Sequence, residues 1–303
     1  MKALITGGAG FVGRHLVKEL YRKKIQTIVY DTVPLEAKKD LLPWTKTISY
    51  IEGNILNFDL LKKAMEGCDL VFHTAAIADI DDARKDPVQT MDVNVLGTAK
   101  CLEAARLNKV SRFLFASSVY ASGNLGSFYS ISKQAGESLA KAYYEDFGLE
   151  YTILRYGSLY GREPNHWNFI YTVCRELLTK GEFIYTSSPD AIREYIHIND
   201  AARETVRIAL DREYINKSVL ITGHQKMKMK EFFEMIQEIL CRKITIHYDE
   251  SKHQRHYIRT PYSFDIEVPI RINISNYVDI SEGILDCLKE VEREIADKND
   301  AEK

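Results

Sequence analysis

Residues 6–13 read Thr6-Gly7-Gly8-Ala9-Gly10-Phe11-Val12-Gly13. An apolar strand pattern at 2–6 precedes this run, and a helical pattern at 10–23 follows it. The glycines fit the GxGxxG spacing as Gly8, Gly10 and Gly13, and a second spacing as Gly7, Gly10 and Gly13. Glycines at a strand-to-helix turn let the backbone approach a pyrophosphate, whose charge the helix N-terminus favours. A glycine-bearing turn without a ligand is the alternative, but the flanking strand and helix favour a dinucleotide site.

Apolar runs alternate with helical patterns over the first half of the chain. The runs that predict buried strands lie at 3–6, 27–30, 70–73, 112–116 and 151–156. The helical patterns lie at 10–23, 59–66, 87–107 and 129–147. Strands that alternate with helices form parallel βαβ units, with right-handed crossovers and helices on both faces of the sheet. We therefore expect an α/β fold with a doubly wound parallel sheet of the Rossmann type.

The alternation loosens after about Gly161, where aromatic-rich helices and short strands follow. A strand pattern at 218–222 and an amphipathic helix at 228–240 form one further unit, and the helix would bury Phe232, Phe233, Ile236 and Leu240 on one side. Because this region has no dinucleotide motif, we expect it to form a smaller, mainly C-terminal α/β domain that binds the substrate.

These patterns divide the chain into two domains and a tail. Residues 1–160, with 196–222 returning to the sheet, are assigned to a dinucleotide-binding domain. Residues 161–195 and 223–295 are assigned to the substrate-binding domain. Residues 296–303 are highly charged and are expected to form a frayed tail.

Asp31 ends the second strand pattern, 18 residues after Gly13. A carboxylate at this point accepts hydrogen bonds from a ribose diol and repels a 2'-phosphate, which favours NAD over NADP. The alternative is a turn residue that caps the segment Thr32-Val33-Pro34. The preceding glycines favour ribose binding.

Tyr129 and Lys133 occur four residues apart in the segment Tyr129-Ser130-Ile131-Ser132-Lys133, inside the helical pattern at 129–147. Residues at i and i+4 lie on one face of a helix, and an ammonium favours a phenolate by direct attraction. Such pairs also arise by chance in helices. Because the chain also has a dinucleotide loop, the two features together predict hydride transfer coupled to removal of a proton from an alcohol.

The chain has 41 basic and 43 acidic side chains and a formal net charge of -2. This balance gives no overall field that would attract nucleic acid or an anionic membrane, so we expect neither as a partner. No apolar run approaches the ~20 residues that span a bilayer, and the chain enters a strand pattern without a signal region. These features predict a cytoplasmic protein that does not bind membranes.

The five cysteines are scattered, with no CxxC pair and no spacing to histidine that suggests a metal site. We interpret them as reduced thiols of a cytosolic protein. The eight histidines contain no HExxH arrangement, and His253 and His256 are interpreted as solvated loop residues. We therefore expect no metal site.

Six further segments accompany the glycine run and the segment at 129–133. They are Gly53-Asn54-Ile55, His73-Thr74-Ala75-Ala76, Asn94-Val95-Leu96-Gly97-Thr98, Phe115-Ala116-Ser117-Ser118, Leu154-Arg155-Tyr156-Gly157-Ser158-Leu159-Tyr160-Gly161 and Arg193-Glu194-Tyr195-Ile196-His197. In this order they resemble the extended short-chain dehydrogenase/reductase family, and within it the nucleotide-sugar epimerases and dehydratases. The similarity covers most of residues 1–222.

The resemblance implies which residues contact the cofactor NAD. They are Gly7, Gly10, Phe11, Val12 and Gly13 at the diphosphate, Asp31 at the ribose, Asn54 and Ile55 near adenine, Ala75 and Ala76 along the cofactor channel, and Asn94, Tyr129 and Lys133 at the nicotinamide half. At position 54 the family more often has aspartate, but the amide oxygen of Asn54 can also accept from the adenine amino group. Lys133 would also hold the ribose.

The resemblance also implies four substrate-binding residues, namely Ser117, Ser118, Ser158 and Arg193. Ser118 aligns with the serine or threonine that holds the reacting hydroxyl, and Ser117 is the fallback if the strand end is shifted. Arg193 would contact the substrate diphosphate. A surface ion pair of Arg193 with Glu194 or a neighbour is the alternative.

The expected reaction begins with proton loss from the substrate to Tyr129. Free tyrosine has a pKa of about 10, too high for an efficient base near neutrality. Lys133 and the positive nicotinamide ring would each lower this pKa by stabilising the phenolate. Hydride transfer to NAD would then leave a ketone at C4 of the sugar, by analogy with the family.

The residues after Ser118 discriminate between the fates of that ketone. Dehydratases of the family place acidic residues there, because loss of water needs one group to remove the C5 proton and another to protonate the leaving hydroxyl. This chain has Val119 and Tyr120. We therefore predict a C4 epimerase acting on a UDP-hexose and disfavour a 4,6-dehydratase. Two further functions stay open: a nucleotide-sugar 4-dehydrogenase or reductase with net NAD(H) turnover, and a non-catalytic NAD-binding sensor or scaffold.

Several positions depart from the family pattern. The loop at 119–128 is short, Ser158 replaces a frequent asparagine, Ala78 stands where some epimerases have a cation, and the segment at 260–264 lacks the usual C-terminal pattern. The identities of the sugar and of the nucleotide base therefore stay open.

The helices predicted at 87–107 and 129–147 resemble the pair through which family members dimerise as a four-helix bundle. Burial against the chain's own sheet is the alternative. Because two long helices on one sheet face commonly leave an apolar outer stripe, we predict a homodimer.

Overall fold

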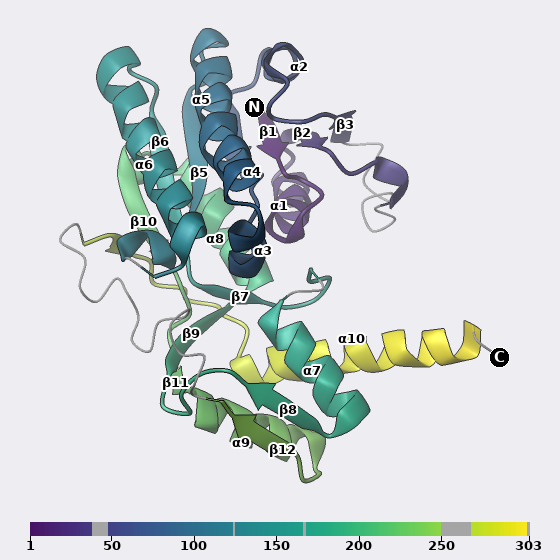
Figure 1. Ribbon diagram of the computed structural model, residues 1–303. Helices are drawn as coiled ribbons and strands as arrows, with labels where there is room; N and C mark the ends of the chain where they lie inside the picture. The colour runs from purple at the N-terminus through teal and green to yellow at the C-terminus, as the bar shows by residue number, and fades with distance from the viewer. Residues whose placement is uncertain (38–47, 124, 166–167, 250–267, 302–303) are drawn as a thin grey trace. The chain divides into compact units, whose positions relative to one another are not determined.

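The computed structural model describes residues 1–37, 48–123, 125–165, 168–249 and 268–301 (Figure 1). The described residues form two compact units. The first unit takes its residues from 1–156, 202–221 and 264–272, and the second from 157–201, 222–263 and 273–303. Each unit has an apolar core of its own.

A parallel sheet lies at the centre of the first unit, with eight strands among the described residues. Its order is β13-β10-β6-β5-β4-β1-β2-β3, and each neighbouring pair is parallel. The strands are β1 (Lys2–Thr6), β2 (Gln26–Asp31), β3 (Ile48–Glu52), β4 (Leu70–His73), β5 (Arg112–Ser118), β6 (Tyr151–Tyr156), β10 (Lys217–Ile221) and β13 (Ile270–Arg271).

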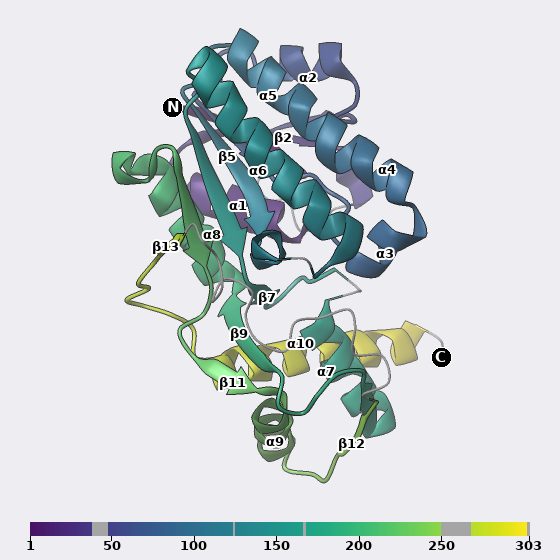
Figure 2. The same cartoon turned by 60° about the vertical axis from the view of Figure 1, so that its left-hand side comes forward.

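Helices cover both faces of this sheet. They are α1 (Phe11–Arg22), α2 (Phe58–Ala64), α3 (Ile80–Lys85), α4 (Pro87–Met91), α5 (Gly97–Leu107), α6 (Ser127–Phe147) and α8 (Ile198–Leu210). Short turns of helix add η1 (Leu35–Ala37), η3 (Asp92–Leu96), η4 (Val119–Ser122) and η5 (Arg212–Tyr214). Figure 2 shows α2, α5 and α6 on one face of the sheet and α1 with α8 on the other. The predicted doubly wound parallel sheet is confirmed.

The strands are buried on both faces, which explains why they read as continuous apolar runs rather than alternating ones. Leu4, Val71 and Phe113 belong to the core beneath α2, α5 and α6. Ile5 and Phe72, the neighbours of two of these residues along the chain, are also fully buried, and side chains of successive strand residues point to opposite faces.

The helix predicted at 87–107 is interrupted. It consists of α4, a π-helical turn at Asp92–Leu96 and α5. A π turn inserts one residue into a helical turn and is frequent at functional sites. The strands β3 and β13 were not among the predicted ones.

The second unit contains two small sheets and three long helices among its described residues. The three-stranded sheet has the order β11-β9-β7, from β7 (Ser158–Tyr160), β9 (Ile192–His197) and β11 (Lys226–Lys228), and a two-stranded parallel sheet pairs β8 (Glu182–Tyr185) with β12 (Thr245–Tyr248). The helices are α7 (Phe169–Lys180), α9 (Met229–Leu240) and α10 (Ile280–Ala301). Phe232, Phe233 and Ile236 of α9 are buried in the core of this unit, as expected, whereas Leu240 packs against that core and is only partly buried.

Some expectations fall at the limits of the described chain. The tail expected to fray at 296–303 begins inside α10, which continues to Ala301, and its fraying stays a prediction. Residues 302–303 lie outside the described residues, as do His253, His256 and the segment at 260–264.

Candidate active site

Gly7 and Gly13 bring the loop at 6–13 against neighbouring backbone. Gly7 has φ +70°, and a Cβ there would lie 2.6 Å from the backbone nitrogen of Ala75. A Cβ on Gly13 would lie 2.2 Å from the carbonyl oxygen of Gly7. Both contacts are too short for any side chain, so these positions need glycine if β1 is to turn directly into α1.

The N-terminus of α1 offers backbone donors. Gly10 is the N-cap of α1, makes no side-chain cap, and donates its own N–H to the carbonyl oxygen of Gly7 at 3.0 Å. The ring of Phe11 packs edge-on against His15, one turn further along α1. The side chain of Phe11 is engaged there, and its backbone lies in the first turn of the helix. Val12 and Gly13 follow in the first turn. Because this N-terminus favours an anion, the loop fits the diphosphate of a dinucleotide.

Asp31 holds the glycine loop in place. One carboxylate oxygen accepts the N–H of Ala9 at 2.9 Å, and the other accepts the N–H of Val33 at 3.0 Å. The second contact is the turn cap that was the alternative to ribose binding. Since each carboxylate oxygen has a further lone pair, Asp31 can also accept from a ribose hydroxyl. That role stays a prediction.

Asn54 and Ile55 follow β3. The side-chain oxygen of Asn54 accepts the N–H of Leu56 at 2.9 Å, and its backbone oxygen accepts the hydroxyl of Tyr30 at 2.9 Å. Ile55 is buried, and a Cβ on Gly97 would lie 2.5 Å from its side chain. Ile55 therefore contributes to the core beneath α5, and the predicted contact of this pair with adenine stays a prediction.

Asn94 lies buried in the π-helical turn. Its amide oxygen accepts the N–H of Ile77 at 2.8 Å, and its amide nitrogen donates to the Ile77 carbonyl at 2.9 Å and to the Ser132 hydroxyl at 3.0 Å. Both amide hydrogens are therefore used within the protein. Asn94 ties the segment after β4, which includes Ala75 and Ala76, to helix α6. The predicted effect of Asn94 on the nicotinamide half would then be indirect.

His73 links three elements beneath this segment. Its Nδ1 lies 2.6 Å from the Thr6 hydroxyl and its Nε2 lies 2.9 Å from the Thr98 hydroxyl, which donates to the Asn94 carbonyl at 2.6 Å. Burial, and then the charge of Lys133, lower the pKa of His73 to about 3. The imidazole is therefore neutral at pH 7 and joins the ends of β1 and β4 to α5. His73 was not among the predicted site residues, although it begins the family segment at 73–76.

Lys133 points from α6 onto the end of β5. Its ammonium donates to the carbonyl oxygen of Ala116 at 2.7 Å and lies 5.7 Å from the ring centroid of Tyr129. Burial lowers the pKa of Lys133 to about 8, and the charge of Glu137 opposes this fall. The charged form therefore still predominates at pH 7, beside Tyr129 on the same helix face.

Two features of the site act in opposite directions on the pKa of Tyr129. Burial raises its pKa to about 12, and a hydrogen bond with the hydroxyl of Ser118 acts in the opposite direction. In the protein chain itself burial outweighs the hydrogen bond with Ser118, and the expected lowering of the Tyr129 pKa by Lys133 and the nicotinamide ring stays a prediction. A further positive charge next to the phenol is needed, and the oxidised nicotinamide ring carries one.

The two serines at the end of β5 have different partners. Ser118 bonds with Tyr129, whereas Ser117 donates to the carboxylate of Glu137 at 2.5 Å. The two partners lie about two turns apart on α6, Tyr129 near its start and Glu137 at its middle, so the adjacent serines at the end of β5 contact different parts of that helix. Ser118 is therefore the serine that can hold a substrate hydroxyl beside Tyr129. The fallback role of Ser117 in substrate binding does not fit, since its hydroxyl is engaged inside the protein.

Glu137 and Arg155 form a buried ion pair behind the two serines. The guanidinium of Arg155 donates to both oxygens of Glu137, at 3.0 and 2.8 Å, and the two side chains are 7% and 5% exposed. Arg155 also donates to the Ser122 hydroxyl at 3.1 Å. This pair was not among the predicted site residues. Two signals could have found it: Glu137 lies eight residues after Tyr129 on one helix face, and Arg155 interrupts an apolar strand.

Ser158 and Arg193 belong to the second unit, in β7 and β9. Arg193 is mostly buried and donates to the carbonyl oxygen of Ile192 at 3.0 Å. Tyr129, Lys133 and Ser118 belong to the first unit. The roles of Ser158 and Arg193 in substrate binding therefore stay predictions.

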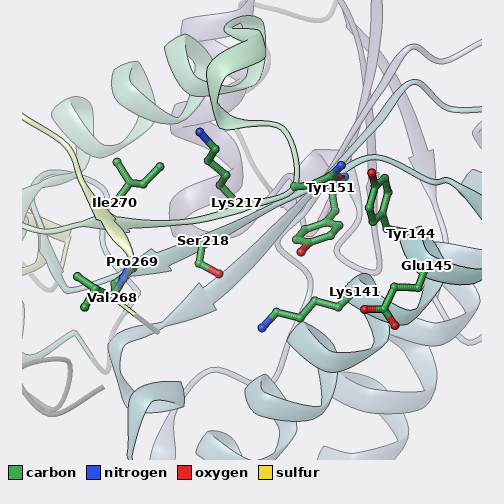
Figure 3. Close-up of a pocket in the computed structure, with 10 residues that line it drawn as sticks. Lys141, Tyr144, Glu145, Tyr151, Lys217, Ser218, Val268, Pro269 and Ile270 are labelled. Atoms are coloured by element: carbon green, nitrogen blue, oxygen red, sulfur yellow. The ribbon is translucent and has the colours of Figure 1, made fainter. Parts of the chain in front are cut away.

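A cavity of about 440 Å³ lies elsewhere in the first unit (Figure 3). Its lining comes from α6, the first residues of β6 and β10, and the segment before and into β13: Lys141, Tyr144, Glu145, Tyr151, Asn216, Lys217, Ser218, Val268, Pro269 and Ile270. Tyr151 begins β6, whereas Ser118 ends β5. The cavity is thus at the amino ends of the parallel strands. Ligands of open α/β sheets bind at the carboxyl ends, where Ser118 and the glycine loop lie.

Neither a metal cluster nor a membrane-spanning helix occurs in the described ranges. No group of three or more histidine, cysteine, aspartate or glutamate residues in these ranges could hold a metal ion. Nor does any described helix combine the length and the apolar character that crossing a membrane requires.

Comparison with known proteins gives consistent matches. The family model described as "NAD dependent epimerase/dehydratase family" matches residues 3–221. An uncharacterized UDP-glucose epimerase of Bacillus subtilis (strain 168) is 28% identical over 272 residues, which cover 82% of this chain and 85% of that protein. The dTDP-glucose 4,6-dehydratase of Mycobacterium tuberculosis (strain ATCC 25618 / H37Rv) is 27% identical over 241 residues, which cover 74% and 72%.

Among solved structures, the UDP-glucuronic acid 4-epimerase of Bacillus cereus, in complex with UDP-glucuronic acid and NAD, has a TM-score of 0.81. It is 23% identical, and the match covers 97% of this chain and 99% of that one. This likeness shows a shared fold. The family match over residues 3–221 places the chain in the NAD-dependent epimerase/dehydratase family of enzymes, whose cofactor is NAD.

Proposed function

We propose that the enzyme epimerises a nucleotide sugar at C4, with a UDP-hexose as substrate, through a transient 4-keto sugar. The observation that carries this proposal is the meeting of Tyr129, Lys133 and Ser118 at the carboxyl end of β5. The phenol provides a base, the ammonium favours its ionised form, and the serine hydroxyl can orient a carbinol. An intact trio of this kind argues against a non-catalytic NAD sensor or scaffold.

The chain's own residues divide the work of binding and proton transfer. The backbone at Gly10, Phe11, Val12 and Gly13 would hold the cofactor diphosphate, and Asp31 would accept from the ribose. A bound NAD would supply the hydride acceptor for the C4 carbon and, once reduced, the hydride donor. Ser118 would orient the C4 hydroxyl, while Tyr129 removes its proton as the C–H bond breaks and later returns that proton to the oxygen.

Epimerisation requires the 4-keto sugar to rotate in the site, so that the hydride returns to the opposite face of C4. This rotation needs no further acid or base. The turn η4 after Ser118 supports this outcome. Val119 there is buried, and the ring of Tyr120 lies edge-on to that of Tyr129, with 6.4 Å between centroids. These positions bring no carboxylate next to Ser118, whereas a 4,6-dehydratase needs an acid and a base for the loss of water.

The substrate's nucleotide end is assigned to the second unit. We propose that Arg193 pairs with the diphosphate of the nucleotide sugar and that Ser158 contacts the sugar. A guanidinium is well suited to a diphosphate because it donates two parallel hydrogen bonds. The names of relatives and neighbours, which include UDP-glucose and UDP-glucuronic acid epimerases, support a UDP-sugar.

We further propose a homodimer formed through α4, α5 and α6. These helices lie side by side in both views of the ribbon (Figures 1 and 2). Exposed apolar side chains lie on α4, on the π-helical turn η3 that follows it and on α6, among them Val88, Leu96 and Ile131, which are 73%, 47% and 53% exposed. Apolar side chains gathered on adjacent helices favour burial against a second copy.

Incubation with NAD and a panel of UDP-, GDP-, dTDP- and CDP-sugars tests the function. We expect a C4-epimeric pair from a UDP-hexose, identified by nuclear magnetic resonance, with no accumulation of NADH absorbance. A keto sugar with stoichiometric NADH would instead identify a 4-dehydrogenase, and a 4-keto-6-deoxy sugar would identify a dehydratase. Bound NAD with no product from any sugar would favour the sensor or scaffold.

A further inference from the structure

The buried pair Glu137 and Arg155 lies directly behind the proposed catalytic residues and has no assigned role. Glu137 accepts three hydrogen bonds, two from Arg155 and one from Ser117. A buried charge is tolerated only when its partners are complete, so such a network holds one geometry strongly. Its members come from α6, β5 and β6, and Ser122 adds the turn η4.

The network joins α6 to the sheet at β5 and β6. Tyr129, Lys133 and Glu137 are spaced by four residues along α6 and therefore share one face. On β5, Ser117 is bonded to Glu137, while the next residue, Ser118, is bonded to Tyr129. Any slide or rotation of α6 that broke the Glu137 contacts would also separate the phenol of Tyr129 from the hydroxyl of Ser118.

The network also places a negative charge one helical turn from Lys133. The charged or titratable groups around that ammonium, among the described residues, are Tyr129 and Glu137 on its own helix, His73 from β4 and, behind Glu137, Arg155 from β6. The neighbours from β5 are neutral, namely the Phe115 ring and the Ala116 carbonyl. Burial lowers the pKa of Lys133, and Glu137 is the group that opposes this.

We propose that Glu137, held by Arg155 and Ser117, is a positioning residue of the active site. It sets the register of α6, so that Tyr129 meets Ser118, and it keeps the Lys133 ammonium protonated at neutral pH. The first role rests on the proposed function, because it concerns the reacting groups. The second concerns the protein alone and can be measured without turnover.

The decisive variant is Glu137→Gln, which keeps the size and an acceptor for Ser117 but removes the charge. Lysine labelled with carbon-13 at Cε reports the titration of Lys133, with the resonance assigned by its loss in Lys133→Arg. We expect the Lys133 midpoint to fall by about one pH unit or more. The alkaline limb of the kcat profile should move to lower pH with it, because the neutral amine no longer stabilises the phenolate.

Glu137→Asp separates charge from shape. It keeps the charge and shortens the side chain, so the Lys133 titration should stay close to that of the unmodified protein. We expect kcat to fall by about tenfold or more, because small displacements of reacting groups are costly. The matched control is Glu204→Gln on α8, which removes another nearly buried carboxylate, 2.7 Å from Arg207. It should leave both the titration and the kcat profile unchanged.

Each outcome has a defined meaning. An unmoved Lys133 titration in Glu137→Gln overturns the electrostatic role, and unchanged kcat in Glu137→Asp overturns the register role. If Glu137→Gln does not fold, Ser117→Ala tests the register with the ion pair intact, and an unchanged kcat there would again count against it. If the unmodified protein turns over no sugar, the proposed function fails, while the Lys133 titration still decides the electrostatic role.

Discussion

The phenol of Tyr129 is the single group on which the proposed proton transfer depends. In the protein its pKa is raised to about 12 by burial, and Ser118 only partly opposes this. A base with this pKa is protonated at neutral pH, so the positive charges of Lys133 and of the oxidised nicotinamide must act together. Binding of the oxidised cofactor would then lower the pKa of Tyr129, so that the base forms only when a hydride acceptor is also bound.

Tyr129→Phe tests this assignment. The variant removes only the hydroxyl, so we expect NAD binding close to that of the unmodified protein and kcat lower by at least ~100-fold, the usual scale of acid–base catalysis. Steady-state kinetics and calorimetry of NAD binding provide the measurements. Tyr144→Phe is the matched control, because Tyr144 is an exposed tyrosine on the same helix. Near-normal turnover in Tyr129→Phe would remove the assigned base.

At the residue scale, the spacing of residues along the sequence predicted contacts between side chains of the same helix. The pair Tyr129 and Lys133 lies four residues apart on one helix, and the structure places its side chains together. The contact of Glu137 with Ser117 and Arg155 joins residues 20 and 18 positions apart. Such contacts depend on how a helix seats on a sheet, which a spacing along one element cannot show.

At the scale of elements, the loop between β1 and α1 could be predicted from its glycines, because a tight strand-to-helix turn with close backbone contacts requires residues without a Cβ. The interruption of the helix predicted at 87–107 was not. The hydrophobic pattern continues through the π-helical turn, and the contacts that accompany that turn, from Asn94 to Ile77 and Ser132, come from other elements. Local periodicity carries no information about them.

Gly13→Ala tests the loop. The added Cβ would lie 2.2 Å from the Gly7 oxygen and 2.6 Å from the Gly8 Cα, so α1 must move away from the loop. We expect NAD affinity to fall by at least ~10-fold, or about 1.4 kcal/mol, and stability to fall by about 1–3 kcal/mol, the usual cost of overpacking. Calorimetry and denaturant unfolding measure the two effects.

Gly10→Ala provides the comparison within the same loop. Its Cβ would lie 3.1 Å from the Gly7 oxygen, and Gly10 has no positive φ, so a small adjustment can accommodate it. We expect smaller losses of affinity and stability than in Gly13→Ala. Equal losses in the two variants would mean that the close approach of backbone at Gly13 is not what the loop requires.

At the scale of the molecule, alternation of strands and helices was enough to predict the doubly wound sheet, because parallel strands need covered faces and long crossovers. The second unit was less predictable. Its short strands pair across large sequence distances, as in β7 with β9 and β8 with β12, and carry no long periodic pattern. Its assigned task of binding the nucleotide sugar rests on family resemblance.

Assembly is the remaining property at this scale, and Ile131→Glu tests it. Ile131 is 53% exposed on α6, two residues from Tyr129, and a carboxylate there would be buried without a partner in the proposed helix bundle. We expect the unmodified protein to have a dimer mass by light scattering at micromolar concentration and the variant to have a monomer mass. Leu210→Glu on α8, at a leucine that is 42% exposed and away from α4, α5 and α6, should stay dimeric.

A monomeric unmodified protein, or a dimeric Ile131→Glu, would contradict an interface on these helices. Because Ile131 and Tyr129 share the first turns of α6, loss of the dimer should also reduce kcat if the partner copy helps to hold this end of the helix.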